Sequence, residues 1–246
     1  MRTSDRLLTV IFLLAAPAAR YFEWKNALDA DGLPTGGFPC FAAVLAAAVL
    51  LFALTAHGLP ARETVTGDFG SIFRFDGQLT LTAAVLGAFL LLAAAALALV
   101  TGGRSAVDLL LAVFLACSGA ALLYVLIAQR REGAFAPVAL LLPTCYLVVQ
   151  LIVTYRSNAR DSVLLHFYVL LLAVAALCLA SLYLAAFAFH SGSPRSFSLC
   201  AHTALTLVSG GCVDAVLSRR LDLLAAFLGA ALLLIAFLEA AGDFEG

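Results

Sequence analysis

Charged side chains are scarce in this chain. Asp, Glu, Lys and Arg make up 12% of its 246 residues, and Lys25 is its single lysine. Soluble domains carry about 25% charged residues, so the composition excludes an ordinary soluble domain. The net charge of −1 leaves no basic surface for a nucleic acid, and no such partner is expected.

Motifs of catalysis and of cofactor binding are also lacking. The chain has no Walker loop, no H-E-x-x-H and no G-x-S-x-G. Its six cysteines have no C-x-x-C spacing and fall in or beside apolar runs, where we expect them to be small hydrophobic residues in helix contacts. His166 and His202 each have a nearby hydroxyl, but no carboxylate lies one helical turn away to orient the imidazole. No metal and no cofactor are therefore expected, and an enzyme is the least favoured functional class.

Apolar residues, by contrast, make up 64% of the chain and are gathered in long continuous runs. A helix rises 1.5 Å per residue, so about 20 apolar residues cross a hydrocarbon core of about 30 Å. The runs lack the period-two alternation of barrel strands. They predict an all-α polytopic transmembrane helix bundle, a single integral membrane domain whose first partner is the lipid bilayer. Its eight spans are expected at about residues 7–22, 38–56, 79–101, 106–128, 136–154, 162–189, 196–217 and 221–239.

Two of these spans have an alternative interpretation. The apolar part of the first, 7–19, is short enough to fit a secretory signal. The aromatic residues of Tyr21 to Trp24 favour a retained helix, bent at Pro17, because such residues are enriched at the headgroup level. The seventh, 196–217, contains His202, several hydroxyls and a Gly-Gly pair, so a re-entrant hairpin is its alternative. Either alternative would reduce the count to seven spans.

The distribution of Lys and Arg predicts no membrane orientation. With eight spans, each side of the membrane collects seven of these residues. An even number of spans places both termini on the same side. The longest connecting segments, 23–37 and 57–78, are too short to fold independently. The aromatic run at 69–75 is expected to lie in the membrane interface.

A weak internal similarity links two span ends that lie four helices apart. FALTAHGLPAR at 52–62 is similar to AAFAFHSGSPR at 185–195, and the span before each contains a proline. A parallel duplication of residues 1–131 and 132–246 would produce this pattern, and some transporters have parallel repeats. Because Ala, Phe and Leu are so common in this chain, chance agreement is the favoured explanation.

Uncharged polar residues form stripes on three of the spans. At about 100° per residue, the members of a stripe lie within an arc of about 80°. The stripe of the fifth span contains Pro143, Tyr146, Gln150 and Thr154, and that of the seventh contains Ser198, His202, Thr206 and Ser209. The sixth span begins with Ser162 and His166 and continues with small residues at Ala173, Ala176 and Ala180. A polar side chain that faces lipid is costly, so these stripes are expected to face the interior of the bundle.

Two functional hypotheses follow from the stripes. In the first, the protein is a permease or membrane receptor that binds a lipid or another small neutral or amphipathic molecule between the fifth, sixth and seventh spans. Gln150 and His202 then face the same interior space. In the second, the stripes only hold helices together, and the protein is a structural or assembly subunit without a ligand. The candidate ligand-binding residues are Tyr146, Gln150, His166, His202, Thr206 and Ser209.

The third and eighth spans, 79–101 and 221–239, have almost no polar residues in their central parts. We expect them at the periphery of the bundle or in the contact of a homo-oligomer. They contain Gly87 and Gly229, and a glycine allows the close approach of a partner helix.

Overall fold

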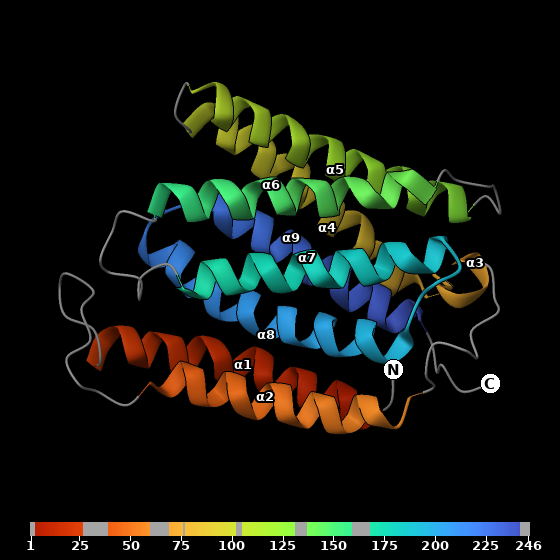
Figure 1. Ribbon diagram of the computed structural model, residues 1–246, viewed down its shortest axis with the longest axis horizontal. Coiled ribbons are helices and arrows are strands. Elements are labelled where there is room, and N and C mark those ends of the chain that lie inside the picture. Colours follow the sequence, from red (N-terminus) through yellow and green to blue (C-terminus); the bar gives the residue numbers. More distant parts are fainter. Residues whose placement is uncertain are drawn as a thin grey trace.

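Figure 1 shows the computed structural model of the chain, which describes residues 3–26, 39–59, 69–75, 77–101, 105–130, 137–158 and 168–241. All regular secondary structure in these residues is helical. The helices are α1 (Thr3–Asn26), α2 (Cys40–His57), α3 (Phe69–Ile72), α4 (Gln78–Thr101), α5 (Ala106–Arg130), η2 (Pro137–Leu140), α6 (Leu141–Asn158), α7 (Tyr168–Ala188), α8 (Pro194–Leu217) and α9 (Leu221–Ala240). Eight helices in the described ranges are long and apolar enough to cross a membrane, which confirms the predicted all-α bundle.

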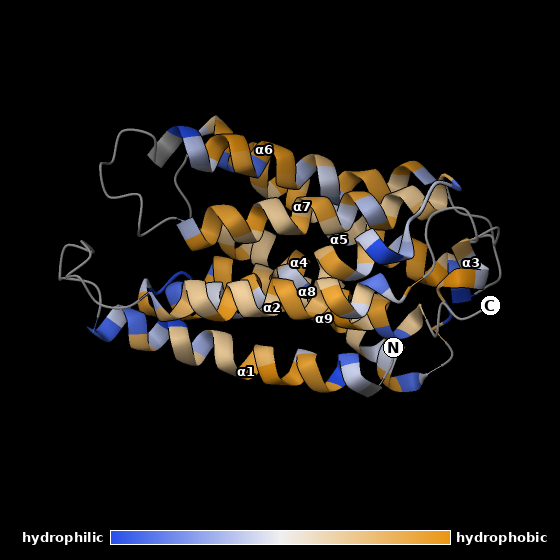
Figure 2. Ribbon diagram, turned by 60° about the horizontal axis from the view of Figure 1, so that its bottom comes forward, coloured by the Kyte–Doolittle hydropathy of each residue, from blue (hydrophilic) through white to orange (hydrophobic). Residues whose placement is uncertain are grey.

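Helix α8 occupies the middle of the bundle and packs against α1, α2, α7 and α9. The pair α1 and α2 lies along one side of it, and α5 and α6 lie on the opposite side of the molecule (Figure 1). Hydrophilic residues gather near the helix ends, whereas hydrophobic residues dominate between them (Figure 2). Of the eight candidate spans, α8 is the most buried, which explains how its central part tolerates polar side chains.

Both ends of the described chain lie at the same end of the bundle (Figure 1). An ion pair joins the start of α1 to the end of α9, with Arg6 Nη2 2.6 Å from Glu239 Oε2. This arrangement agrees with the prediction from an even number of spans.

The two doubtful spans are both continuous helices. Helix α1 runs unbroken through Pro17, and α8 runs unbroken through its Gly-Gly pair, so the re-entrant alternative is wrong. Helix α8 begins at a defined cap, because the Ser193 hydroxyl accepts a hydrogen bond from the backbone N–H of Ser196 and Pro194 occupies the first turn.

Tight turns join α7 to α8 and α8 to α9. Arg219 has a φ of 55°, and the N–H of Arg220 donates to the carbonyl of Ala215 over 2.9 Å. This is the Schellman pattern of a helix C-terminus, in which the left-handed position is usually glycine. His190 occupies the equivalent position after α7, with a φ of 54°. The short turns make α7, α8 and α9 consecutive neighbours.

Helices α4 and α9 come into backbone contact at Gly87 and Gly229. A Cβ atom on either glycine would lie 2.8 Å from the carbonyl oxygen of the other. Leu233 of α9 is only 5% exposed, whereas Ala93 of α4 is exposed. The prediction that both spans are peripheral is therefore wrong for α9. An apolar helix suits a protein core as well as lipid, so the lack of polar groups could not distinguish the two.

The aromatic run at 69–75 is also placed differently from the prediction, because its phenylalanines enter the bundle. Phe73 is 1% exposed, and its ring makes edge-to-face contacts with rings on α7, α8 and α9 at centroid distances of 5.2 to 5.8 Å. The N–H of Arg74 donates to the carbonyl of Ala240 over 2.8 Å and fixes this segment against α9. We call the following residues the aromatic cluster: Phe69, Phe73, Phe75, Phe187, Phe197 and Phe237. Such ring contacts contribute about 0.5–1.5 kcal/mol each beyond the burial of area, which favours burial over the interface.

Candidate functional site

Two adjoining cavities lie between α4, α5, α6, α7 and α9. The inner chamber has a volume of about 110 Å³, and the vestibule, nearer the end of the bundle, has a volume of about 340 Å³. The residues that line both cavities are Leu115, Tyr146, Gln150, Leu223 and Ala226. Helix α8 contributes no described residue to either cavity. The cavities therefore adjoin α6 and α7, which are the fifth and sixth predicted spans, but not α8, the seventh.

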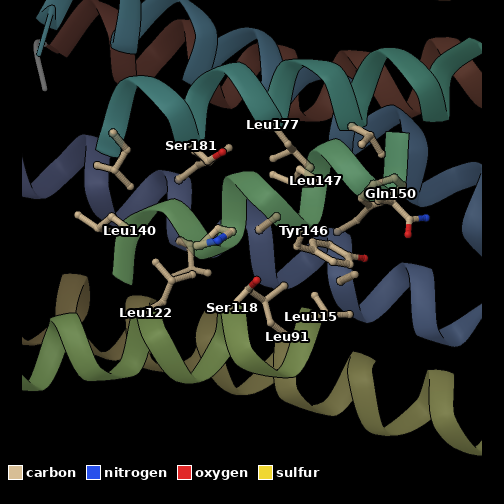
Figure 3. A pocket seen from close by; sticks show the side chains of 18 of the residues that line it. Leu91, Leu115, Ser118, Leu122, Leu140, Tyr146, Leu147, Gln150, Leu177 and Ser181 are labelled. Carbon is tan, nitrogen blue, oxygen red and sulfur yellow. The ribbon is translucent and has the colours of Figure 1, made fainter. Parts of the chain in front are cut away.

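The inner chamber is almost wholly apolar (Figure 3). Its polar walls include Ser118 and Ser181, and both hydroxyls already have partners. Ser118 Oγ donates to the carbonyl of Phe114 over 2.7 Å, and Ser181 Oγ lies 2.9 Å from Thr144 Oγ1. An apolar lining of this kind favours apolar groups over water. The far end of the chamber is lined by Phe237, a member of the aromatic cluster.

The vestibule is polar by comparison. Its described lining includes Asp108 of α5, Arg220 before α9 and Asp222 at the start of α9. Arg220 Nη2 donates to Asp222 Oδ2 over 2.8 Å. Asp108 accepts a hydrogen bond of 2.7 Å from the Ser105 hydroxyl and belongs to the cap of α5. Because Asp108 and Arg220 are exposed, the vestibule is open at this end of the bundle.

Helix α6 places Tyr146 and Gln150 one turn apart at the junction of the two cavities. Figure 3 shows both side chains at one end of the chamber, with Leu140 and Leu122 towards the other end. Gln150 Nε2 lies 3.3 Å from Thr154 Oγ1 one turn further on, and Pro143 lies one turn before Tyr146 in the chamber wall. The polar stripe predicted on this span therefore follows the cavity along most of its length.

The remaining candidate residues lie elsewhere. His202, Thr206 and Ser209 are on α8, and none of them lines the chamber or the vestibule. The His202 ring is 2% exposed and stacks on Phe52 of α2, with 4.5 Å between centroids. The prediction that Gln150 and His202 face one space is wrong, because the His202 ring faces α2 and not the cavities. His166 lies outside the described residues.

The polar groups of α8 are largely satisfied within the helix itself. Thr206 Oγ1 donates to the carbonyl of His202 over 3.0 Å, and Ser209 Oγ donates to the carbonyl of Thr206 over 2.8 Å. His202 Nδ1 lies 2.7 Å from the carbonyl of Ser198, and because a carbonyl only accepts, Nδ1 carries the proton. These bonds explain how a buried helix accommodates its hydroxyls and the Nδ1 of an imidazole. The Nε2 of His202 is buried and has no hydrogen-bond partner among the described residues.

A buried group of charges escaped the sequence analysis. Arg20 of α1 is 0% exposed, and its guanidinium bonds to two carboxylates. Arg20 Nε is 2.9 Å from Asp214 Oδ1 of α8, and Nη1 is 2.9 Å from Glu23 Oε2. The Tyr168 hydroxyl of α7 donates to Glu23 Oε2 over 3.2 Å, and its ring lies 5.2 Å from the guanidinium carbon. We call Arg20, Glu23, Tyr168 and Asp214 the ion cluster.

A helical signal for the ion cluster does exist in the sequence. The buried face of α1 repeats at intervals of three and four residues, and the last two positions of this face are charged. The members of this face are Asp5, Thr9, Phe12, Ala16, Arg20 and Glu23. In the balance of Lys and Arg, Arg20 is only a charge at a span end. Two charged residues that continue a buried stripe predict a partner on another helix.

The ion cluster and the vestibule lie at the same end of the bundle. Tyr168 of the cluster and Leu170 of the vestibule wall are both in the first turn of α7. The cluster itself lines neither cavity, and its contacts join α1 to α7 and α8. Comparison with protein-family models, curated protein sequences and solved structures finds no match to this chain.

Proposed function

We propose that the chain is an integral membrane protein that binds a small amphipathic molecule in the space formed by the chamber and the vestibule. It would act as a membrane receptor or a permease for that molecule. The observation that supports this function is the change of wall chemistry across two adjoining cavities, from apolar around Leu177 to polar around Gln150 and Asp108. Ligand pockets typically combine an apolar wall with a few polar groups that fix orientation.

The volumes restrict the ligand to a compact one. The chamber, at about 110 Å³, is smaller than the apolar cavity of about 150 Å³ that holds a benzene ring, so it suits a short branched chain or a small ring that extends into the vestibule. The vestibule, at about 340 Å³, falls within the range of small-molecule sites and takes the polar part. A lipid with two long acyl chains exceeds the chamber.

A structural or assembly subunit without a ligand is the alternative function. It is favoured by the intrahelical hydrogen bonds of the α8 hydroxyls and by the ion cluster, which need no ligand. The two functions differ in what the hollow does. A receptor or permease loses ligand binding when a side chain fills the hollow. A purely structural protein has no ligand binding to lose.

Binding of a neutral probe tests the proposal. Cyclohexanol combines a compact apolar ring with one hydroxyl, and we expect it to raise the thermal unfolding temperature of the purified protein in detergent. Ala230→Phe places a ring in the chamber, and Ala226→Val fills less of it. Both variants are expected to lose the response to cyclohexanol.

The matched control is Ala93→Phe, which adds the same ring on the exposed face of α4. It corrects for probe that partitions into the micelle and is expected to respond like the unmodified protein. An equal response of Ala230→Phe, Ala226→Val and Ala93→Phe would overturn the proposal.

A further inference from the structure

We propose that the site selects a compact amphiphile with a positively charged head, such as an amine on a small ring. This inference rests on the proposed function, and it adds the charge of the ligand. The apolar part lies in the chamber, and the ammonium group lies in the vestibule beside Asp108.

The charges of the vestibule favour a cation. Among the described residues that line it, the charged ones are Asp108, Asp222 and Arg220. Arg220 is held by Asp222 over 2.8 Å, so these two charges compensate each other. The Asp108 carboxylate has the neutral Ser105 hydroxyl as its partner, over 2.7 Å. Among the described residues, one negative charge is therefore left without a cationic partner in the vestibule, beside the apolar chamber.

The groups at the junction also suit an ammonium. Ammonium has three donors and no acceptor, so it needs acceptor oxygens around it. Gln150 supplies an amide oxygen and Tyr146 supplies a phenol oxygen, and both residues line the chamber and the vestibule. The Tyr146 side chain lies at the same end of the chamber as Gln150 (Figure 3). The two side chains therefore place their oxygens at the end of the chamber that adjoins the vestibule.

The geometry also orients the ligand. The chamber ends at Phe237 in the aromatic cluster and carries no charge among its described lining residues. A charged head buried there would lose its hydration without a partner, which costs far more than an exposed contact. The head must therefore remain at the Asp108 end, with the apolar ring towards Leu177.

Three probes with the same ring and different heads test this inference. Cyclohexylamine is cationic at neutral pH, cyclohexanol is neutral and cyclohexanecarboxylate is anionic. Thermal shifts measured over a range of probe concentrations give an apparent Kd for each. We expect cyclohexylamine to bind about two- to fivefold more tightly than cyclohexanol, the range of an exposed charge contact, and the carboxylate to bind most weakly.

Asp108→Asn removes the charge with little change of shape and keeps an oxygen for the Ser105 hydroxyl. In this variant cyclohexylamine and cyclohexanol are expected to bind equally, while retained cyclohexanol binding shows that the fold is intact. Glu239→Gln is the matched control, because it removes one negative charge at the other end of the bundle. It is expected to keep the preference for the amine.

The outcomes separate this inference from the proposed function. Equal binding of amine and alcohol to the unmodified protein, or an unchanged preference in Asp108→Asn, would overturn the cationic ligand and leave the binding site standing. Tightest binding of the carboxylate would also overturn it and would assign the head to Arg220. No thermal shift with any probe would overturn both.

Discussion

Arg20 Nε lies 2.9 Å from Asp214 Oδ1, and the two residues are 194 positions apart in the chain. The contact fixes the first long helix of the described chain against the central helix α8. The guanidinium is fully buried and also bonds to Glu23 over 2.9 Å. Charges within a membrane-spanning helix are costly unless they are paired, so this contact determines which face of α1 turns inward.

Replacing Arg20 is expected to destabilise the protein strongly. Arg20→Gln removes the guanidinium from two acidic side chains in a buried site, and breaking such a pair costs about 3–5 kcal/mol. Arg6→Gln is the control, because the Arg6 side chain is 57% exposed in its ion pair with Glu239. Its loss is expected to cost less than about 1 kcal/mol. The free energy of unfolding in mixed micelles measures both, and equal losses would contradict the assigned role of the ion cluster.

The close contact of α4 and α9 makes a second prediction about stability. Gly229→Ala places a methyl group 2.8 Å from the carbonyl oxygen of Gly87, so the helices must separate. Overpacking of this kind costs about 1–3 kcal/mol, and the higher helix propensity of alanine offsets about 1 kcal/mol of that cost. Gly229→Ala is therefore expected to lower the free energy of unfolding. Gly70→Ala is the control, since a Cβ there meets nothing within 4 Å. A gain in the unfolding free energy for Gly229→Ala would show that the backbones are not in contact.

The turn between α8 and α9 gives a prediction of the opposite sign. Arg219 has a φ of 55°, a conformation that costs a residue with a side chain about 1–2 kcal/mol. Arg219→Gly is therefore expected to stabilise the protein by up to about 1 kcal/mol, after the added entropy of the unfolded chain is subtracted. Ser218→Gly, at a φ of −81°, is expected to be neutral or destabilising. The thermal unfolding temperatures of the two variants are compared with that of the unmodified protein. A loss of stability in Arg219→Gly would show that the backbone of Arg219 is not strained.

Much of the fold was predictable because each long apolar run determines a helix locally. The stripe with Tyr146 and Gln150 also followed from helical periodicity alone. Periodicity shows which face of a helix is distinctive but not which neighbour covers that face. The stripe of α8 was therefore assigned to α6, although His202 stacks on Phe52 of α2.

Long-range partners explain the other differences between prediction and structure. The burial of Arg20 depends on Asp214, which lies on a helix far along the chain. The burial of Phe73 depends on rings contributed by three different helices. A single residue in a short connecting segment shows no periodicity from which such partners can be predicted.

The separate locations of His202 and Gln150 allow stability and binding to be separated by mutation. Gln150→Leu removes an amide at the junction of chamber and vestibule and keeps a similar volume. We expect cyclohexylamine to bind this variant about fivefold more weakly, which corresponds to about 1 kcal/mol for a hydrogen bond to a charged group beside water.

His202→Ala removes a stacked ring and its buried hydrogen bond, far from both cavities. It is expected to lower the unfolding free energy by about 2 kcal/mol and to leave the Kd of the probe unchanged. If instead His202→Ala weakened probe binding as much as Gln150→Leu did, the ligand would contact α8, and the two cavities between α4, α5, α6, α7 and α9 would not be the functional site.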